Sequence, residues 1–333
     1  IDQGCNLILP IHKALDAARE DAAGKAKVGT TRRGISPCNA DRASYFGIRF
    51  CDLQQDLDGA RARLKRNLVE KNAVLQALGA PTMTEDEVLA PVLEAYEGLR
   101  PHIGDARSIV HSYISDARRV LFEGAQGTFL DSLHGSYPYV TSIPCVAGMA
   151  AVGSGVGPKA INGVIGVVKA YTTRVGSGPF PAELHGEDGE RLREAGGEYG
   201  ATTGRPRRCG WLDLPMLRYA VKVNGITALA ITKLDVLTGI EAIEICNRYR
   251  WPNHGRYIGH DESLTTWLLE NVTCQWDTVQ GWEEDISGVR RRENLPEAAQ
   301  RYVSRIEEAA GVPVVLVSVG PERDQTIRCG EVW

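Results

Sequence analysis

The stretch EYGATTGRPRRCGWLDLPMLRYAVKVNGITALAITKLDVLTG, residues 198–239, decides the predicted fold. It ends in the apolar run 226–231, which is typical of a strand buried on both faces of a parallel sheet. Upstream, Asp213 is placed to cap a helix with Pro215 in its first turn and Gly225 just past its end. A helix that leads into a buried strand predicts an α/β fold with a mostly parallel sheet.

The turn Thr-Lys-Leu-Asp follows this strand, at residues 232–235. Open α/β sheets bind ligands at the carboxyl ends of their strands. The Asp235 carboxylate can accept two N–H bonds from the N1 and 2-amino edge of guanine, and the Lys233 stem can cover the ring. The turn therefore predicts a guanine site, and a surface Lys–Asp pair of little energetic consequence is the alternative that stays open.

The loop Ala-Thr-Thr-Gly-Arg-Pro-Arg-Arg occupies residues 201–208. Guanidinium groups bind carboxylate or phosphate through paired hydrogen bonds. Gly204 permits backbone shapes that other residues resist, so the loop could close over an anion. The residues predict an anion site, and a solvated basic turn is the alternative.

Two upstream segments have a similar composition. The loop at residues 28–37 carries hydroxyls, glycines and two arginines, which suit a phosphate monoester or a plain basic surface loop. We expect residues 120–122 to form a short strand that leads into Glu-Gly-Ala-Gln-Gly-Thr at 123–128. There Gln126 can donate to and accept from the amide-like edge of a hypoxanthine ring, or the turn holds no ligand. This turn lacks the P-loop pattern.

The rest of the chain supports the same fold class. Residues 163–168 and 312–317 predict further buried strands, and 296–310 predict a helix. Residues 53–104 predict a helical subdomain, in which Thr84 and Glu87 form a capping box. Residues 241–290 predict a small, mixed and mainly antiparallel excursion whose four tryptophans fill a core. We therefore predict an α/β protein with a large, mostly parallel sheet flanked by helices.

Composition narrows the range of functions that this chain can have. The chain has 333 residues with 43% apolar and 24% charged side chains and a net charge of -4, so nothing draws it to nucleic acid or to an anionic membrane. No apolar run is long enough to cross a bilayer. None of the eight cysteines forms a C-x-x-C pair and no histidines stand at metal-ligand spacing, which predicts free thiols in the cytoplasm.

Six blocks along the chain resemble the adenylosuccinate synthetase family, in that family's order. They are FEGAQGT, GSYPYVTS, TRVGSGPFP, ATTGRPRRCGW, TKLDVLTG and VSVGPERDQTI. The resemblance covers nearly all of residues 1–333 and implies one such domain with a P-loop-NTPase-like architecture. It implies a homodimeric ligase of AMP biosynthesis that uses GTP and Mg²⁺ to join L-aspartate to IMP through a 6-phosphoryl-IMP intermediate.

The resemblance also implies roles for residues that match the family's motifs. The implied IMP contacts are Thr31, Gln126, Thr141, Val175 and Arg205. The implied aspartate contacts are Thr202, Thr203 and Arg205. The implied GTP contacts are Arg207, Lys233, Asp235, Ser318 and Gly320.

This chain departs from the family's pattern at several places. Arg32 stands where the family usually has glycine, and Tyr45 stands where the family's partner subunit supplies an arginine to the IMP phosphate. Residues 143–146 also differ from the family's usual Ser-Asn-x-Thr.

The family's glycine-rich phosphate loop, with its catalytic acid, base and Mg²⁺ ligands, has no counterpart in residues 1–333. We expect a strand–loop–helix unit that carries these groups to precede Ile1, and we expect that the 333 residues alone do not transfer a phosphoryl group. Two alternatives stay open. One is a related ligase that acts on another purine monophosphate such as dGMP, and the other is a guanine-nucleotide-binding fragment without catalysis.

Overall fold

The computed structural model describes residues 1–24, 27, 29–200, 204–252 and 255–331. It divides into two compact units. Unit 1 comprises Ile1–Ala125, Thr141–Pro144 and Met149–Ala160, and unit 2 comprises Gln126–Val140, Cys145–Gly148 and Ile161–Trp333. No helix among the described residues is both long and apolar enough to cross a membrane.

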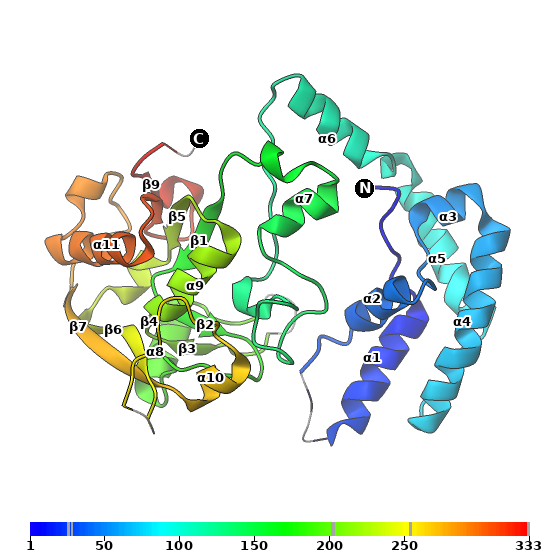
Figure 1. The fold of residues 1–333 in the computed structure, drawn as a ribbon, viewed down its shortest axis with the longest axis horizontal. Helices are drawn as coiled ribbons and strands as arrows, with labels where there is room; N and C mark the ends of the chain where they lie inside the picture. The colour runs from blue at the N-terminus through cyan, green and yellow to red at the C-terminus, as the bar shows by residue number, and fades with distance from the viewer. Residues whose placement is uncertain (25–26, 28, 201–203, 253–254, 332–333) are drawn as a thin grey trace. The chain divides into compact units, whose positions relative to one another are not determined.

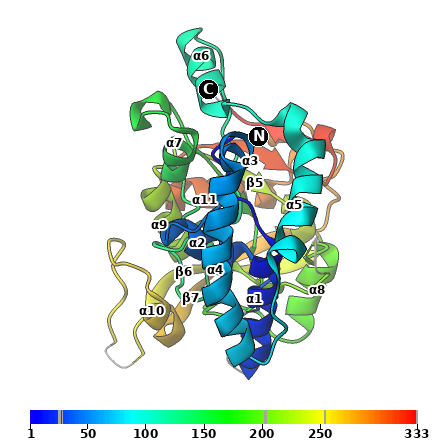
Figure 2. The ribbon, with the colours of Figure 1, turned by 90° about the vertical axis from the view of Figure 1, so that its right-hand side faces the viewer.

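Unit 1 is built from helices around a core of aliphatic side chains that includes Leu15, Leu64 and Leu89. Figures 1 and 2 show α1, α4 and α5 close together, and each of these helices contacts the other two. The helices are α1 (Pro10–Ala22), α2 (Ile35–Ala43), α3 (Phe50–Gln55), α4 (Leu57–Ala77), α5 (Glu85–Leu99), η2 (Arg100–His102), α6 (Ala106–Ser115), α7 (Gly148–Ser154) and η4 (Pro158–Ala160).

Short-range signals account for the helix ends in this unit. The Thr84 hydroxyl accepts the Glu87 N–H at 3.3 Å and the Glu87 carboxylate accepts the Thr84 N–H at 2.7 Å, which is the predicted capping box. Asp56 accepts the Gly59 N–H and so separates α3 from α4. The expected strand at residues 120–122 is wrong: Leu121 is 76% exposed, and no strand among the described residues pairs with this run.

Unit 2 contains the central sheet, whose strand order is β1-β5-β8-β9. The first three strands are parallel and β9 is antiparallel. The prediction of an α/β fold with a mostly parallel sheet is therefore confirmed. The strands are β1 (Ile165–Lys169), β5 (Ala228–Thr232), β8 (Val314–Ser318) and β9 (Thr326–Arg328).

Two long helices, α9 (Leu214–Asn224) and α11 (Glu297–Ala310), pack on each other and share one apolar core with β5 and β8 (Figure 1). The Asp213 carboxylate accepts the Met216 N–H at 3.0 Å at the start of α9. Gly225, with φ 61°, ends this helix in the left-handed conformation. These are the predicted cap and stop of the helix that leads into β5.

A second sheet has the order β4-β6-β7, in which β6 and β7 follow β5 and the short β4 precedes it. Its long antiparallel pair β6–β7 is the core of the expected excursion. Of the tryptophans expected in a core, Trp282 is 3% exposed, but Trp267 is 64% and Trp276 39% exposed, so the prediction is wrong for these two. The remaining elements of unit 2 are η3 (Thr128–Leu130), β2 (Thr172–Arg174), α8 (Glu187–Ala195), β3 (Arg208–Gly210), β4 (Leu212–Asp213), η5 (Leu234–Leu237), β6 (Ile240–Arg250), α10 (Thr266–Asn271), β7 (Thr273–Trp282), η6 (Arg292–Asn294) and η7 (Arg323–Gln325).

Candidate functional site

The carboxyl ends of β1, β5 and β8 meet at one edge of the central sheet. Lys169, the last residue of β1, lies opposite Thr232, the last residue of β5. On the other side of β5, Ile231 lies opposite Val317 of β8, so Ser318 also reaches this edge. Because such edges bind ligands in open α/β sheets, the groups that follow these strands form the candidate site.

The turn after β5 presents a lysine and a half-buried carboxylate. Lys233 has φ 60°, in the left-handed region that non-glycine residues seldom adopt. Asp235 follows in η5, and its Oδ1 is buried without a hydrogen-bond partner among the described residues. Burial raises the pKa of Asp235, since it penalises the charged form more than the residue's own backbone N–H and the nearby Lys233 favour it. An acceptor of this kind is suited to the N–H donors of a ligand.

Strand β8, which ends at Ser318, contacts η5. The Ser318 hydroxyl donates to the Gly320 carbonyl at 2.8 Å, which closes the turn. A side chain at position 320 would displace the amide of Gln325, which accepts the Glu322 N–H at 3.0 Å and donates to the Ser287 carbonyl at 3.2 Å. The structure therefore brings Ser318 and Gly320 beside the turn that carries Lys233 and Asp235.

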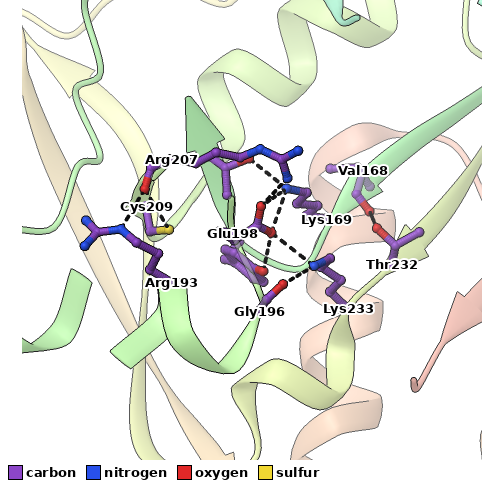
Figure 3. A network of polar contacts seen from close by, with 11 residues as sticks. Val168, Lys169, Arg193, Gly196, Glu198, Arg207, Cys209, Thr232 and Lys233 are labelled. Atoms are coloured by element: carbon purple, nitrogen blue, oxygen red, sulfur yellow. Dashed lines mark hydrogen bonds and ion pairs between the residues drawn. The ribbon is translucent and has the colours of Figure 1, made fainter. Parts of the chain in front are cut away.

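A fully buried glutamate joins this edge to the arginine loop. Figure 3 shows Glu198 between Lys169, Arg207 and Lys233. Lys169 Nζ lies 2.7 Å from Glu198 Oε1, Arg207 Nη1 lies 2.6 Å from Oε2, and Lys233 Nζ lies 3.3 Å from Oε1. The Tyr171 hydroxyl also donates to Oε1, at 2.6 Å. We call these five residues the Glu198 cluster.

Electrostatics keep the glutamate of this cluster charged. Burial by itself would raise the pKa of Glu198, but hydrogen bonds from Lys169, Tyr171 and Arg207 outweigh burial and lower the pKa to about 2. Burial lowers the pKa of Lys169, and the Glu198 carboxylate opposes that effect. Three cationic side chains share one carboxylate, so the cluster keeps a positive balance that favours an anion.

The arginine loop is a narrow hairpin at its base. The Arg207 N–H donates to the Glu198 carbonyl and the Gly200 N–H to the Arg205 carbonyl, both at 2.8 Å. The Arg205 side chain is exposed. Arg208 pairs with the Glu183 carboxylate. Thr202 and Thr203, the predicted aspartate contacts, lie outside the described residues.

The turn that carries Val175 is fixed by a buried arginine. Arg174 donates to the Ser177 carbonyl at 3.0 Å, to the Ser136 hydroxyl at 2.9 Å and to the Tyr139 carbonyl at 3.1 Å. Burial lowers the pKa of Arg174 to about 10. Val175 itself is 47% exposed, so it lies at an accessible turn that the hydrogen bonds of Arg174 fix in place.

The segment that follows Gln126 is organised by one carboxylate. Asp131 is fully buried and accepts four backbone N–H bonds. The donors are Leu133 at 2.8 Å, His134 at 2.8 Å, Cys145 at 2.5 Å and Val146 at 3.0 Å. Gln126 is exposed and has φ 62°, another left-handed position. Its amide is therefore available to a ligand.

Unit 1 carries the two remaining predicted contacts. Thr31 is exposed, and its loop is tied to α1 by Asp16, which accepts the Thr30 hydroxyl at 2.8 Å and the Gly34 N–H at 2.9 Å. Arg32, which stands where the resemblance led us to expect glycine, has φ 55°, in the left-handed region that favours glycine. Thr141 is half-buried.

Sequence reasoning did not single out three members of the cluster, Lys169, Tyr171 and Glu198. Lys169 and Glu198 are separated by 29 residues, and only the folded structure brings their side chains together. The available signal was the lysine at the end of a buried strand run, which places a charge at the ligand edge.

The described residues offer one group of three possible metal ligands that include thiols, Asp213, Cys246 and Cys274, whose ligand atoms lie within 4.8 Å of one another. Both Asp213 oxygens already accept hydrogen bonds, from the Met216 N–H and the Tyr249 hydroxyl. Mg²⁺ prefers oxygen ligands and keeps several waters, so this buried thiol-containing group does not fit magnesium.

Comparisons with known proteins identify the family. The family model for adenylosuccinate synthetase matches residues 1–327. Curated adenylosuccinate synthetases from Trichlorobacter lovleyi and Desulfosudis oleivorans are 48% and 49% identical to this chain over 329 and 328 residues. Each match covers 98% of this chain, which spans about three quarters of those relatives, 75% and 76%.

A solved structure of the same family also matches this chain. The fully ligated adenylosuccinate synthetase from Plasmodium falciparum matches with a TM-score of 0.92 at 35% identity, over 99% of this chain and 77% of that one. The chain therefore belongs to the adenylosuccinate synthetase family, whose members are ligases that join aspartate to IMP with GTP.

Proposed function

We propose that this protein joins L-aspartate to IMP in AMP biosynthesis, through a 6-phosphoryl-IMP intermediate. In the first step the γ-phosphoryl group of GTP moves to O6 of IMP, which leaves GDP. In the second step the amino group of aspartate attacks C6, the C6–O6 bond breaks, and inorganic phosphate leaves with O6. Family membership and the groups at the sheet edge support this proposal.

The guanine base of GTP binds at the turn after β5. The observation that carries this assignment is the buried Asp235 oxygen, which lacks a partner among the described residues. Guanine offers N1–H and a 2-amino group, which would satisfy the carboxylate and favour its charged form. The Lys233 stem covers the ring, and the turn of Ser318 and Gly320 lines the other side of the base.

Arg207 binds the phosphates of GTP. Its guanidinium belongs to the Glu198 cluster, whose positive balance favours a polyphosphate.

The arginine loop binds aspartate. Arg205 is exposed at the end of the hairpin, and its planar guanidinium matches a carboxylate with two parallel hydrogen bonds. Thr202 and Thr203 complete the carboxylate site. The backbone hydrogen bonds at the base of the loop, which include the Arg205 carbonyl, hold this residue in place.

IMP is bound by residues from several segments. Thr31 and Thr141 contact its phosphate, the Val175 backbone meets the ribose, and Gln126 reads the amide-like edge of hypoxanthine. Arg205 contributes to the nucleotide as well as to aspartate. The support for these roles is that Thr31, Gln126 and Val175 are exposed on anchored loops.

Three further features belong to the proposal. Mg²⁺ assists phosphoryl transfer in this family, but we assign it no ligand among the described residues. The enzyme is a homodimer, in which the strongly exposed Tyr45 takes the place of the partner arginine. The reaction takes place in the cytoplasm, which is supported by eight cysteines that are all free thiols.

The direct test is a reconstitution with the protein expressed from its complete gene. We expect an N6-succinylated purine nucleotide to appear only when IMP, aspartate and GTP are all present, with one GDP and one phosphate for each product. ATP in place of GTP should support the reaction poorly. Product formation that does not require aspartate, or equal rates with dGMP in place of IMP, would contradict the proposal.

A further inference from the structure

Glu198 connects three segments that are distant in sequence. Lys169 ends β1, Arg207 directly precedes β3, and Lys233 directly follows β5. All three cations contact one fully buried carboxylate (Figure 3). Its backbone carbonyl also accepts the Arg207 N–H, so residue 198 holds both the backbone and the side chain of Arg207.

The neighbouring contacts restrict the same two side chains further. Lys233 Nζ donates to the Gly196 carbonyl as well as contacting Glu198. Arg193 of α8 donates to the Arg207 carbonyl at 2.9 Å. Long side chains such as these lose much rotamer freedom when they are fixed, and a side chain fixed before binding does not lose it on binding.

We propose that Glu198 is a positioning residue that holds the side chains of Lys233 and Arg207 in the positions that bind GTP. It thereby fixes the turn after β5 relative to the base of the arginine loop. This inference rests on the proposed GTP roles of Lys233 and Arg207. Glu198 itself does not touch the nucleotide. One negative charge holds three cations together without cancelling them, so the cluster stays attractive to a polyphosphate.

The test is the affinity for GDP, measured by titration calorimetry in the protein expressed from its complete gene. Glu198→Gln keeps the shape of the side chain and removes its charge. We expect the dissociation constant for GDP to rise by about tenfold because two side chains lose their preset positions. The matched control is Glu183→Gln, which removes a carboxylate that pairs with Arg208 but with neither GTP residue. The control should stay within about twofold of the parent.

A double-mutant cycle separates positioning from general destabilisation. Lys233→Met alone should weaken GDP binding. If Glu198 acts through Lys233, the double variant should lose less affinity than the product of the two single losses. Independent, multiplicative losses would overturn the positioning role.

The outcomes also separate this inference from the proposed function. If Lys233→Met and Arg207→Met both leave GDP affinity unchanged, the proposed GTP site is wrong. If those variants weaken GDP binding but a folded Glu198→Gln protein does not, only the positioning role is wrong. Should Glu198→Gln fail to fold, Glu198→Asp keeps the charge on a shorter side chain that cannot span Lys233 and Arg207. Unchanged GDP affinity in that variant would overturn the inference.

Discussion

Replacing Asp235 with asparagine should have two opposite effects. The carboxylate is proposed to accept two N–H bonds from guanine, and each hydrogen bond to a charged group contributes about 1.5–3 kcal/mol. The asparagine amide keeps one acceptor oxygen, but its NH2 group would face one of the guanine N–H groups, so that two donors oppose each other. We therefore expect GTP affinity to fall by about 3 kcal/mol or more, at least ~100-fold, with a much smaller loss for ITP, which lacks the 2-amino group.

The free protein should become more stable, because the buried Asp235 Oδ1 has no partner among the described residues and burial raises the pKa of this group. A raised pKa in the folded state means that the cost of the charge is present at neutral pH and disappears as the pH falls through the folded pKa. The free energy of unfolding of Asp235→Asn should thus exceed that of the parent by up to about 1 kcal/mol at pH 7. The excess should vanish near pH 4.

Steady-state KM values for GTP and ITP test the first effect, and urea unfolding at pH 7 and pH 4 tests the second. The control is Asp285→Asn, which removes an exposed charge near Asp235 that does not belong to the proposed guanine site. The control should leave the preference for GTP over ITP intact. Unchanged GTP preference in Asp235→Asn would refute the guanine assignment, and lower stability at pH 7 would refute the account of its buried charge.

Three further perturbations test other parts of the site. Arg205→Lys should raise KM for aspartate by about tenfold, because lysine cannot form the paired fork; an unchanged KM would contradict the role of the arginine loop. Asp131→Asn should lower the free energy of unfolding by about 2–4 kcal/mol at pH 7, since four backbone N–H groups lose a charged acceptor. Backbone hydrogen bonds outweigh burial and lower the pKa of Asp131. In urea unfolding the parent's advantage should therefore shrink as the pH falls below the ordinary pKa of aspartate and be lost below the lowered pKa, and a constant difference would refute this. Tyr45→Arg should lower KM for IMP by about tenfold if a homodimer brings this position to the phosphate of the partner's IMP, and a higher or unchanged KM would argue against that geometry.

Local sequence signals predicted the parts of the fold that depend on neighbouring residues. Asp213 and Gly225 marked both ends of α9, and Thr84 with Glu87 marked the start of α5. These signals work because the capping groups lie within four residues of the backbone that they satisfy.

The prediction was poorer wherever partners come from distant sequence. The apolar run at 120–122 has the composition of a strand, but a strand also needs a neighbour, and composition does not reveal one. Trp267 is aromatic but lies mostly exposed on α10. At the site, Lys233 and Asp235 stood out because they directly follow a strand, whereas Glu198 gained its importance only when β1, β5 and the arginine loop came together.

The central claim is most directly tested by the fate of the oxygen at C6 of IMP. IMP labelled with ¹⁸O at O6 should be incubated with GTP and aspartate, and the released phosphate analysed by mass spectrometry. If the phosphoryl group passes to O6 and aspartate then displaces it, each product nucleotide should be matched by one phosphate that carries the label. Unlabelled phosphate, or phosphate release without aspartate and without product, would contradict the proposed reaction.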